Sequence, residues 1–107
     1  MTSDLEKSFD KAMMDLYHET KKAGYSATRF HEMLCSDKGL ATARKLIHAP
    51  ISEGYTTLIM RGRPELTVEA FIFDHPEWHP LFSVEDLEKV KKRLKDIKYP
   101  EAYRKEG

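Results

Sequence analysis

The stretch that decides the fold is Ser3–Gly24, SDLEKSFDKAMMDLYHETKKAG. Its apolar side chains recur every three or four residues, a spacing that places them on one side of an α-helix. They are Leu5, Phe9, Ala12, Met13, Leu16 and Tyr17. Ser3 and Glu6 form the capping-box pattern that starts a helix, and Gly24 suits the left-handed position that ends one. The stretch therefore predicts one amphipathic helix.

Two further helices are expected after this one. Ser26 is a suitable N-cap for a short helix whose apolar residues lie within 27–34. Cys35–Gly39 has the composition of a turn. A third apolar stripe follows over 40–47, and Pro50 prevents that helix from continuing.

The second half of the chain contains an ambiguous segment between two clearer helices. Ser52 starts a helix that ends before Gly62, and Ser83 starts the last one. Thr67–Phe73, TVEAFIF, is rich in strand-forming residues, but no other segment is available to pair with it. We therefore expect a short buried helix capped by its threonine. Asp74–Pro80 contains two prolines, and no continuous regular element is expected there.

These segments define an all-α fold. The chain has 107 residues, enough for one hydrophobic core of ordinary size. Its composition is 40% hydrophobic and 34% charged, which is sufficient for a compact domain. We expect a single-domain bundle of five to six short helices over residues 1–100, with 101–107 as a C-terminal tail.

The charge balance and the cysteine content argue against several classes of protein. Basic and acidic residues number 18 each, whereas dedicated nucleic-acid binders usually have a basic excess. Cys35 is the only cysteine, so an internal disulfide and a cysteine-based zinc site are excluded. No segment has the length of a membrane span, and the acidic start is unlike a signal peptide. We expect a cytoplasmic protein without a membrane partner and without a cofactor.

Two groups of side chains are candidate metal ligands or acid–base groups. His31 and Cys35 lie one helical turn apart and share a face, as in a metal-binding helix that lacks its third ligand. The other group is the densest set of ligand-type residues in the chain: Asp74, His75, Glu77 and His79. The first pair has no evident third ligand, so a half-buried thiol beside a surface imidazole is the simpler interpretation. For the second group, ordinary turn chemistry with Trp78 holding the loop to the core is the simpler interpretation.

A third group consists of cations that could contact nucleic acid: Arg29, Arg44, Lys45, Arg61 and Arg63. The segments around Gly39 suggest a helix-turn-helix, although Lys45 stands where that motif favours an apolar residue. The last helix carries many lysines, but its acidic residues are placed for i,i+4 pairs such as Glu85 with Lys89 and Glu88 with Lys92. This pattern favours a solvated, salt-bridged face.

The order of several motifs resembles a family of small prokaryotic helical proteins with no known activity. The motifs are Gly24–Phe30 (GYSATRF), Gly39–Ile47 (GLATARKLI), Ser52–Leu58 (SEGYTTL), Gly62–Ala70 (GRPELTVEA) and Pro80–Ser83 (PLFS). Within residues 14–98, which the resemblance covers, Pro64 and Glu65 replace the usual Leu and Asp, and the histidines around Trp78 are less typical. The resemblance implies a bacterial or archaeal cytosolic protein and assigns no catalytic residue.

Three functional hypotheses remain open from the sequence. The leading one is a non-enzymatic protein-interaction module that binds another protein or a second copy of itself. The second is a nucleic-acid-binding accessory protein that uses the five cations above. The third is a small metal-binding protein or metal-dependent enzyme that uses one of the two ligand groups.

Overall fold

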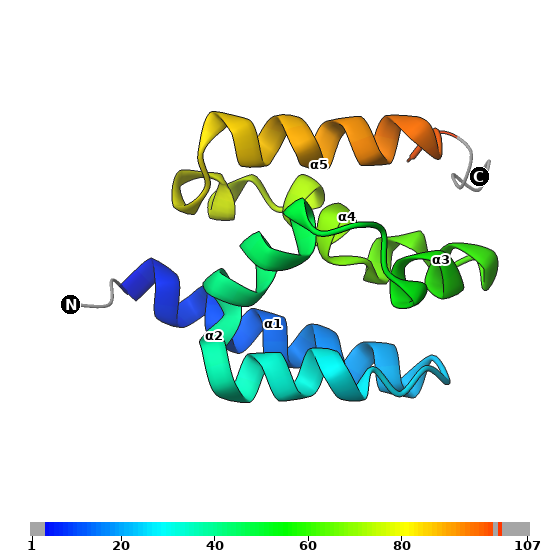
Figure 1. The fold of residues 1–107 in the computed structure, drawn as a ribbon. Coiled ribbons are helices and arrows are strands. Elements are labelled where there is room, and N and C mark those ends of the chain that lie inside the picture. The colour runs from blue at the N-terminus through cyan, green and yellow to red at the C-terminus, as the bar shows by residue number, and fades with distance from the viewer. Residues whose placement is uncertain (1–3, 100, 102–107) are drawn as a thin grey trace.

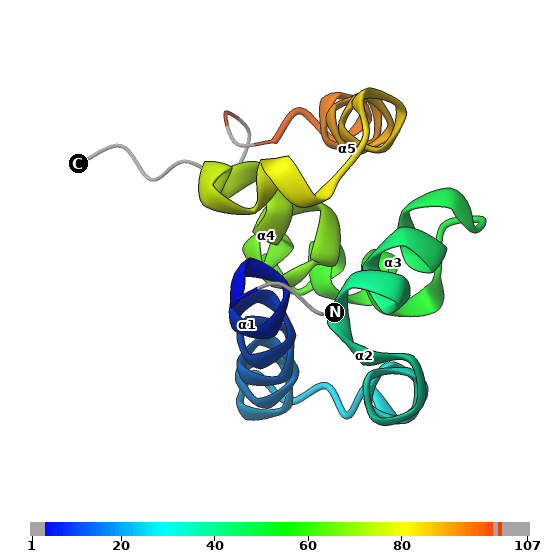
Figure 2. The same ribbon diagram turned by 90° about the vertical axis from the view of Figure 1, so that its left-hand side faces the viewer.

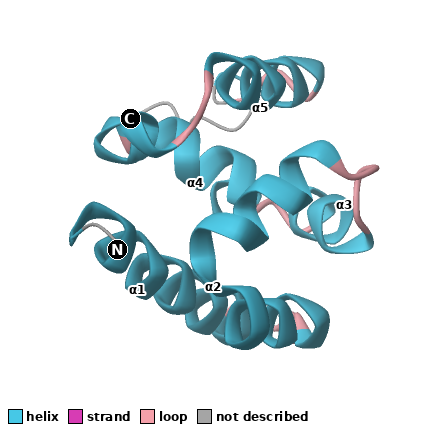
Figure 3. Cartoon of the chain, turned by 60° about the vertical axis from the view of Figure 1, so that its left-hand side comes forward, coloured by secondary structure: helices cyan, strands magenta, loops and turns pink. Residues whose placement is uncertain are grey.

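The computed structural model describes residues 4–99 and residue 101, and within them the chain forms only helices and short loops (Figures 1 and 3). The α-helices are α1 (Asp4–Lys22), α2 (Thr28–His48), α3 (Glu53–Met60), α4 (Val68–Asp74) and α5 (Val84–Asp96). Two short 3₁₀-helices, η1 (Pro64–Leu66) and η2 (Pro76–Leu81), flank α4. The expected all-α bundle is therefore confirmed, including a helix in the ambiguous segment before Asp74.

The helices are arranged around α4. Helix α1 packs against α2 on one side of the molecule, and α5 packs against α4 on the opposite side (Figures 1 and 2). Because α4 lies between these layers, its residues Val68, Ala70 and Ile72 are all buried. A short segment of strand-forming residues is thus stabilised as a helix by contacts on several sides. None of the described helices is long and apolar enough to cross a membrane.

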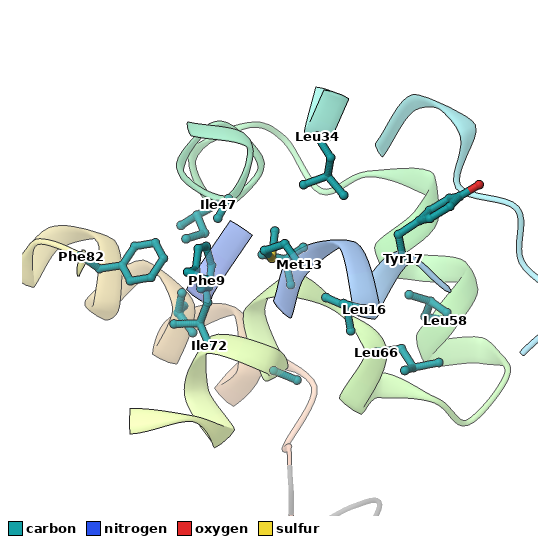
Figure 4. Packing of buried hydrophobic residues seen from close by; sticks show 14 of the residues in the cluster. Phe9, Met13, Leu16, Tyr17, Leu34, Ile47, Leu58, Leu66, Ile72 and Phe82 are labelled. Atoms are coloured by element: carbon teal, nitrogen blue, oxygen red, sulfur yellow. The ribbon is translucent and has the colours of Figure 1, made fainter. Parts of the chain in front are cut away.

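The apolar stripe of α1 forms the centre of the hydrophobic core (Figure 4). Phe9 and Met13 are completely buried, and they pack in one cluster with residues from α2, α4 and α5. The ring of Phe9 meets the rings of Trp78 and Phe82 edge-on, at centroid distances of 5.4 and 5.5 Å. Such edge-to-face contacts are the favoured geometry of aromatic pairs. The contacts hold η2 and the residue that follows it against α1.

The caps predicted for the later helices are confirmed. The side chains of Ser52, Thr67 and Ser83 each accept a hydrogen bond from a backbone N–H three residues further on, at 3.1 Å in each case. Gly24 has a φ of +94°, the left-handed conformation expected after the end of α1. These features depend on neighbours along the chain, which explains why they are visible in the sequence.

Two expectations about secondary structure are wrong: the N-cap at Ser26 and the lack of a regular element in Asp74–Pro80. Ser26 is not an N-cap, because α2 begins at Thr28 after Ala27, which provides no capping side chain. Ser3, the expected cap of α1, lies outside the described residues. The two prolines after α4 do not prevent regular structure either, because η2 spans them. A proline has no backbone N–H to donate. The 3₁₀ turns around the two prolines are closed by the N–H groups of other residues, such as Trp78 and Phe82.

The expected turn at Cys35–Gly39 is wrong in extent, because α2 continues through it and breaks at a single residue. Lys38 has φ 67° and ψ 177°, a conformation that is costly for any residue with a Cβ. The next residue, Gly39, donates its N–H to Oδ1 of Asp10 at 2.8 Å. Asp10 on α1 thereby caps the second half of α2, residues 39–48. This one-residue break is too short for the turn of a helix-turn-helix motif.

Gly39 is required by close packing. A Cβ atom at this position would lie 3.0 Å from the Cα of Asp10 and 2.9 Å from its Oδ1. The sequence predicts Gly39 as part of a turn, and the break in α2 does lie next to it, but the glycine itself does not adopt the turn conformation. Lys38 adopts the unusual backbone conformation, and Gly39 allows α1 and α2 to approach each other.

We predict that Lys38→Gly stabilises the protein by about 1 kcal/mol, because glycine removes most of the backbone strain and loses part of the gain to chain entropy. Urea unfolding followed by circular dichroism measures the change. In the same assay Gly39→Ala should lower the free energy of unfolding, because the added methyl group would collide with Asp10. A loss of stability in Lys38→Gly would contradict the strained conformation.

Candidate binding pocket

A pocket of about 600 Å³ opens to solvent between α2, α3 and the start of α4. Figure 2 shows α2 and α3 on the same side of α4. The apolar part of its lining comes from both halves of α2, from α3 and from the link before α2, and includes Tyr25, Phe30, Met33, Leu46, Tyr55 and Leu58. A cavity of this size, with apolar walls and a few polar groups, is typical of a binding site.

The floor of the pocket contains a buried ion pair. Nη1 of Arg93 on α5 lies 2.8 Å from Oε2 of Glu69 on α4, and both side chains are less than a tenth exposed. The same guanidinium donates to the carbonyl of Leu46 at 2.9 Å and to that of Ala49. Arg93 therefore joins α5 to α4 and to the C-terminal end of α2.

The surroundings of this ion pair shift the pKa of Glu69 in opposite directions. Burial raises the pKa of the Glu69 carboxyl, and the hydrogen bond from Arg93 partly offsets that effect. The Tyr55 hydroxyl, which lines the same pocket, donates to the backbone carbonyl of Arg93 at 3.1 Å. The floor is thus a set of polar groups that are already engaged with one another.

Neither Arg93 nor Glu69 is among the candidate site residues that the sequence indicates. A signal was present, because Arg93 follows Val90 by three residues and precedes Leu94, on the apolar side of the last helix. Its partners, however, lie on segments that are distant in the sequence. The separation between Arg93 and Glu69 is 24 residues, which no local pattern reveals.

The rim of the pocket is charged. Arg29 is exposed there and has no ion-pair partner among the residues that the structure describes. Lys45 also lines the pocket and lies 2.7 Å from Oδ2 of Asp37. Glu53 contributes one exposed carboxylate. Next to the lining residues of the α2–α3 link, Ile51 is 53% exposed.

The five cations proposed to contact nucleic acid are divided among different environments. Arg29 and Lys45 line the pocket. Arg44 donates to the carbonyl of Leu81 at 2.8 Å and lies 3.5 Å from a carboxylate oxygen of α5, and Arg63 lies 2.6 Å from Glu65. Arg61 lies beside Gly24 at the end of α1, where one of its nitrogens would be 3.0 Å from a Cβ on that glycine. Three of the five are thus held by acceptors of the chain itself.

The first candidate metal pair is brought together, but without a third ligand. Sγ of Cys35 lies 3.8 Å from Nε2 of His31 on the surface of α2. The imidazole of His31 also stacks on the ring of Tyr17, with centroids 4.5 Å apart. Within residues 4–99 and 101, no group of three or more His, Cys, Asp or Glu side chains is placed to hold a metal ion.

The second candidate group closes the end of α4. His75 and His79 point a ring nitrogen at the carbonyl oxygens of residues 71 and 72, at 2.7 and 3.0 Å, so each donates an N–H there. These carbonyls belong to the last turn of α4, which leaves some of its acceptors without an intrahelical partner. Asp74 and Glu77 are exposed beside them. The described geometry therefore gives the two histidines a capping role.

Asp86 forms a second polar junction, between the end of α2 and the start of α5. Its carboxylate accepts from Nε2 of His48 at 2.6 Å and from the N–H of Ser83 at 3.0 Å, the second being half of the α5 capping box. Burial would raise the pKa of Asp86, but these two hydrogen bonds outweigh it and hold the pKa below its usual value.

We predict that the stabilisation by Asp86 depends on pH. Its pKa is lower in the folded than in the unfolded protein, so the stabilisation is complete above about pH 4 and is lost as the pH falls through the folded value. Asp86→Asn should therefore cost about 1–2 kcal/mol at neutral pH and progressively less in acid. Urea unfolding of both proteins over a pH series at constant ionic strength measures this. A pH-independent difference would contradict the charged hydrogen bonds.

We also predict that Arg93→Met destabilises the protein by about 3–5 kcal/mol, because it leaves the Glu69 carboxyl buried without its partner. The double variant Arg93→Met with Glu69→Leu should recover much of this loss, since it removes the unpaired charge. Denaturant unfolding of the parent, of Arg93→Met, of Glu69→Leu and of the double variant gives the coupling between the two side chains. Equal losses in the single and double variants would show that Arg93 acts through its carbonyl contacts alone.

Comparison of the chain with protein-family models, curated proteins and solved structures gave no match. The resemblance of its motifs to a family of small prokaryotic helical proteins is therefore not accompanied by a family assignment. The functional argument rests on the geometry of the described residues.

Proposed function

We propose that the protein is a non-enzymatic interaction module that binds a segment of a partner protein in the pocket between α2 and α3. The main support for this proposal is an open pocket with apolar walls. At its rim lies Arg29, which is exposed and has no ion-pair partner in the described part of the chain. The favoured partner segment inserts an apolar or aromatic side chain and carries a carboxylate close to it.

The walls of the pocket support an apolar anchor. Phe30, Met33 and Leu58 present hydrocarbon and ring surface to the cavity, and the methionine can adapt its shape to different side chains. Protein interfaces obtain much of their binding free energy from one or two such anchors inserted in pockets. The exposed Ile51 beside the pocket extends the apolar surface that a partner would cover.

The rim supports an acidic neighbour for that anchor. Arg29 and Lys45 are the two cations of the rim and Glu53 is its carboxylate, but Lys45 is already paired with Asp37 at 2.7 Å. An arginine at the edge of an interface can hold a carboxylate through two parallel hydrogen bonds. A partner carboxylate next to the anchor would therefore be attracted to Arg29, the rim cation with no ion pair inside the described chain.

The floor supports binding rather than acid–base chemistry. A general acid or base needs a free proton-transfer atom directed at the substrate. Here the Arg93 guanidinium is occupied by Glu69 and two backbone carbonyls, and the Tyr55 hydroxyl is occupied by a third carbonyl. These groups fix the shape of the floor.

The proposal is tested by selecting from a random peptide library displayed on phage against the purified full chain. Wild-type protein should enrich sequences that share one apolar or aromatic residue next to Asp or Glu. A synthetic peptide of the enriched sequence should then bind with a measurable Kd in fluorescence polarisation. Thr28→Trp should reduce that affinity at least about tenfold, because Thr28 is exposed at the pocket mouth and the indole would block it.

Thr56→Trp is the matched control, since Thr56 is exposed on α3 and does not line the pocket. It should bind the peptide like the wild type, and circular dichroism should show both variants folded. Failure to enrich any common sequence would refute the proposal. Equal binding by the wild type and Thr28→Trp would also refute it, because the peptide would then occupy another surface.

A further inference from the structure

A second hollow, of about 480 Å³, lies where the C-terminal half of α5 meets the end of α4. Its lining consists of Phe73, Lys91, Leu94, Lys95, Lys98, Tyr99 and Glu101. None of these residues lines the pocket between α2 and α3, so the two hollows are separate surfaces. We call this second one the α5 hollow.

The α5 hollow has a basic edge. Lys91, Lys95 and Lys98 follow one another at spacings of four and three residues, which places them along one side of the helix and its end. All three are exposed. In the described chain none of them lies within 4.0 Å of a carboxylate oxygen. Three ammonium groups are therefore available to an external anion.

The salt-bridged face expected for this helix is not formed. Neither Glu85 with Lys89 nor Glu88 with Lys92 makes an ion pair in the part of the chain that the structure describes. Exposed i,i+4 pairs contribute only a few tenths of a kcal/mol, so long side chains readily remain solvated. The lysines of α5 are consequently not neutralised by their own helix.

The end of α5 is shaped to bring an aromatic ring into the hollow. Lys98 has a φ of +57°, a left-handed conformation usually reserved for glycine at the end of a helix. This conformation lets the N–H of Tyr99 return to the carbonyl of Leu94, at 2.9 Å. The chain thus turns back on itself and places Tyr99 beside α4, with the Lys98 side chain at the rim.

The ring of Tyr99 is held in a fixed position. It meets the ring of Phe73 edge-on, with centroids 6.4 Å apart and planes at 78°. Its hydroxyl donates to the carboxylate of Asp74. Burial and this carboxylate raise the pKa of Tyr99, so the phenol stays protonated and keeps the hydrogen bond. Both rings are partly exposed and present aromatic surface to the hollow.

The residues that line the α5 hollow include more basic than acidic side chains. Glu101 is the acidic side chain of the lining, opposed by three lysines. Asp74 lies nearby and accepts the Tyr99 hydroxyl, and Glu65 on η1 is paired with Arg63 at 2.6 Å. A linear polyanion that follows Lys91, Lys95 and Lys98 would meet three cations in succession. Glu88, which is exposed one turn before Lys91 on the same side of α5, lies at the start of this row.

We infer that the α5 hollow binds single-stranded nucleic acid. The backbone phosphates contact Lys91, Lys95 and Lys98, and an unpaired base packs against the rings of Phe73 and Tyr99. Aligned cations beside exposed aromatic rings are the features by which proteins hold single strands without sequence preference. A duplex fits less well, because its bases are already stacked and cannot enter the hollow.

The same observations disfavour an anionic membrane as the partner. Surface-bound helices insert large apolar side chains next to their basic residues. The large apolar residues that are strongly exposed in the described chain are Ile51, Met60 and Val84. Only Val84 belongs to α5, at its first residue, and none of the three lines the α5 hollow. The rings that do line it are packed against the core instead.

The test is fluorescence anisotropy with labelled oligo(dT) and oligo(U) and the full chain. Each phosphate contact to a single strand contributes roughly 0.7 to the slope of log K against log salt, so three lysines predict a slope of about −2. Lys91→Ala with Lys95→Ala should reduce this slope to about −0.7 and lower the affinity. Phe73→Leu should weaken binding about tenfold with the slope unchanged, because stacking does not involve ions.

The matched control is Lys7→Ala with Lys11→Ala, two exposed lysines with the same i,i+4 spacing on α1. It should bind like the wild type, and circular dichroism should confirm that all variants are folded. Equal loss in the α1 and α5 double variants would overturn the inference, as would no binding at low salt. Tighter binding to a duplex or to vesicles containing phosphatidylserine would overturn it in favour of those partners.

Discussion

The bundle depends most on the buried guanidinium of Arg93. One side chain from α5 meets a carboxylate on α4 and two carbonyls at the end of α2, so three elements converge on it. Removing an arginine and a glutamate from water is costly and is tolerated only when both find strong partners. The carbonyls also require this contact, because the last acceptors of α2 have no intrahelical donor. The same two side chains, Arg93 and Glu69, form the floor of the pocket between α2 and α3.

The other constraint is the close approach of α1 and α2 at Gly39. Asp10 caps the second half of α2 from outside the helix, and a Cβ at Gly39 would collide with the Asp10 backbone. The break at Lys38 then lets the two halves of α2 take different directions. The first half packs on α1, while the second half reaches α4 and α5 and ends at Arg93 (Figure 1). Both halves of α2 line the pocket, so the break at Lys38 lies within the helix that forms this wall.

Much of the fold could be predicted from the sequence, because its signals are local. The apolar stripe of α1 and the caps at Ser52, Thr67 and Ser83 involve residues within one or two turns of each other. The candidate site could not be predicted in the same way. Arg93 stands on the apolar side of its own helix, which is a local signal, but Glu69 is 24 residues away in the sequence and no local pattern joins the two. The density of ligand-type residues around Trp78 suggests a metal or acid–base site, but the two histidines among them hydrogen-bond to the end of α4.

Helix α5 shows why composition alone gives a poor account of function. Lys91, Arg93 and Lys95 are separated by single residues, so they alternate around the helix. The arginine turns inward, where its planar group satisfies several acceptors at once, a task for which an ammonium is less suited. The two lysines turn outward and keep their charge in water. Arg93 is paired with Glu69 inside the protein, whereas Lys91 and Lys95 form no ion pair within the described chain. A chain with zero formal net charge therefore still presents unpaired cations at its surface. The position of each charge on the helix, rather than the sum of charges, therefore determines what this protein can bind.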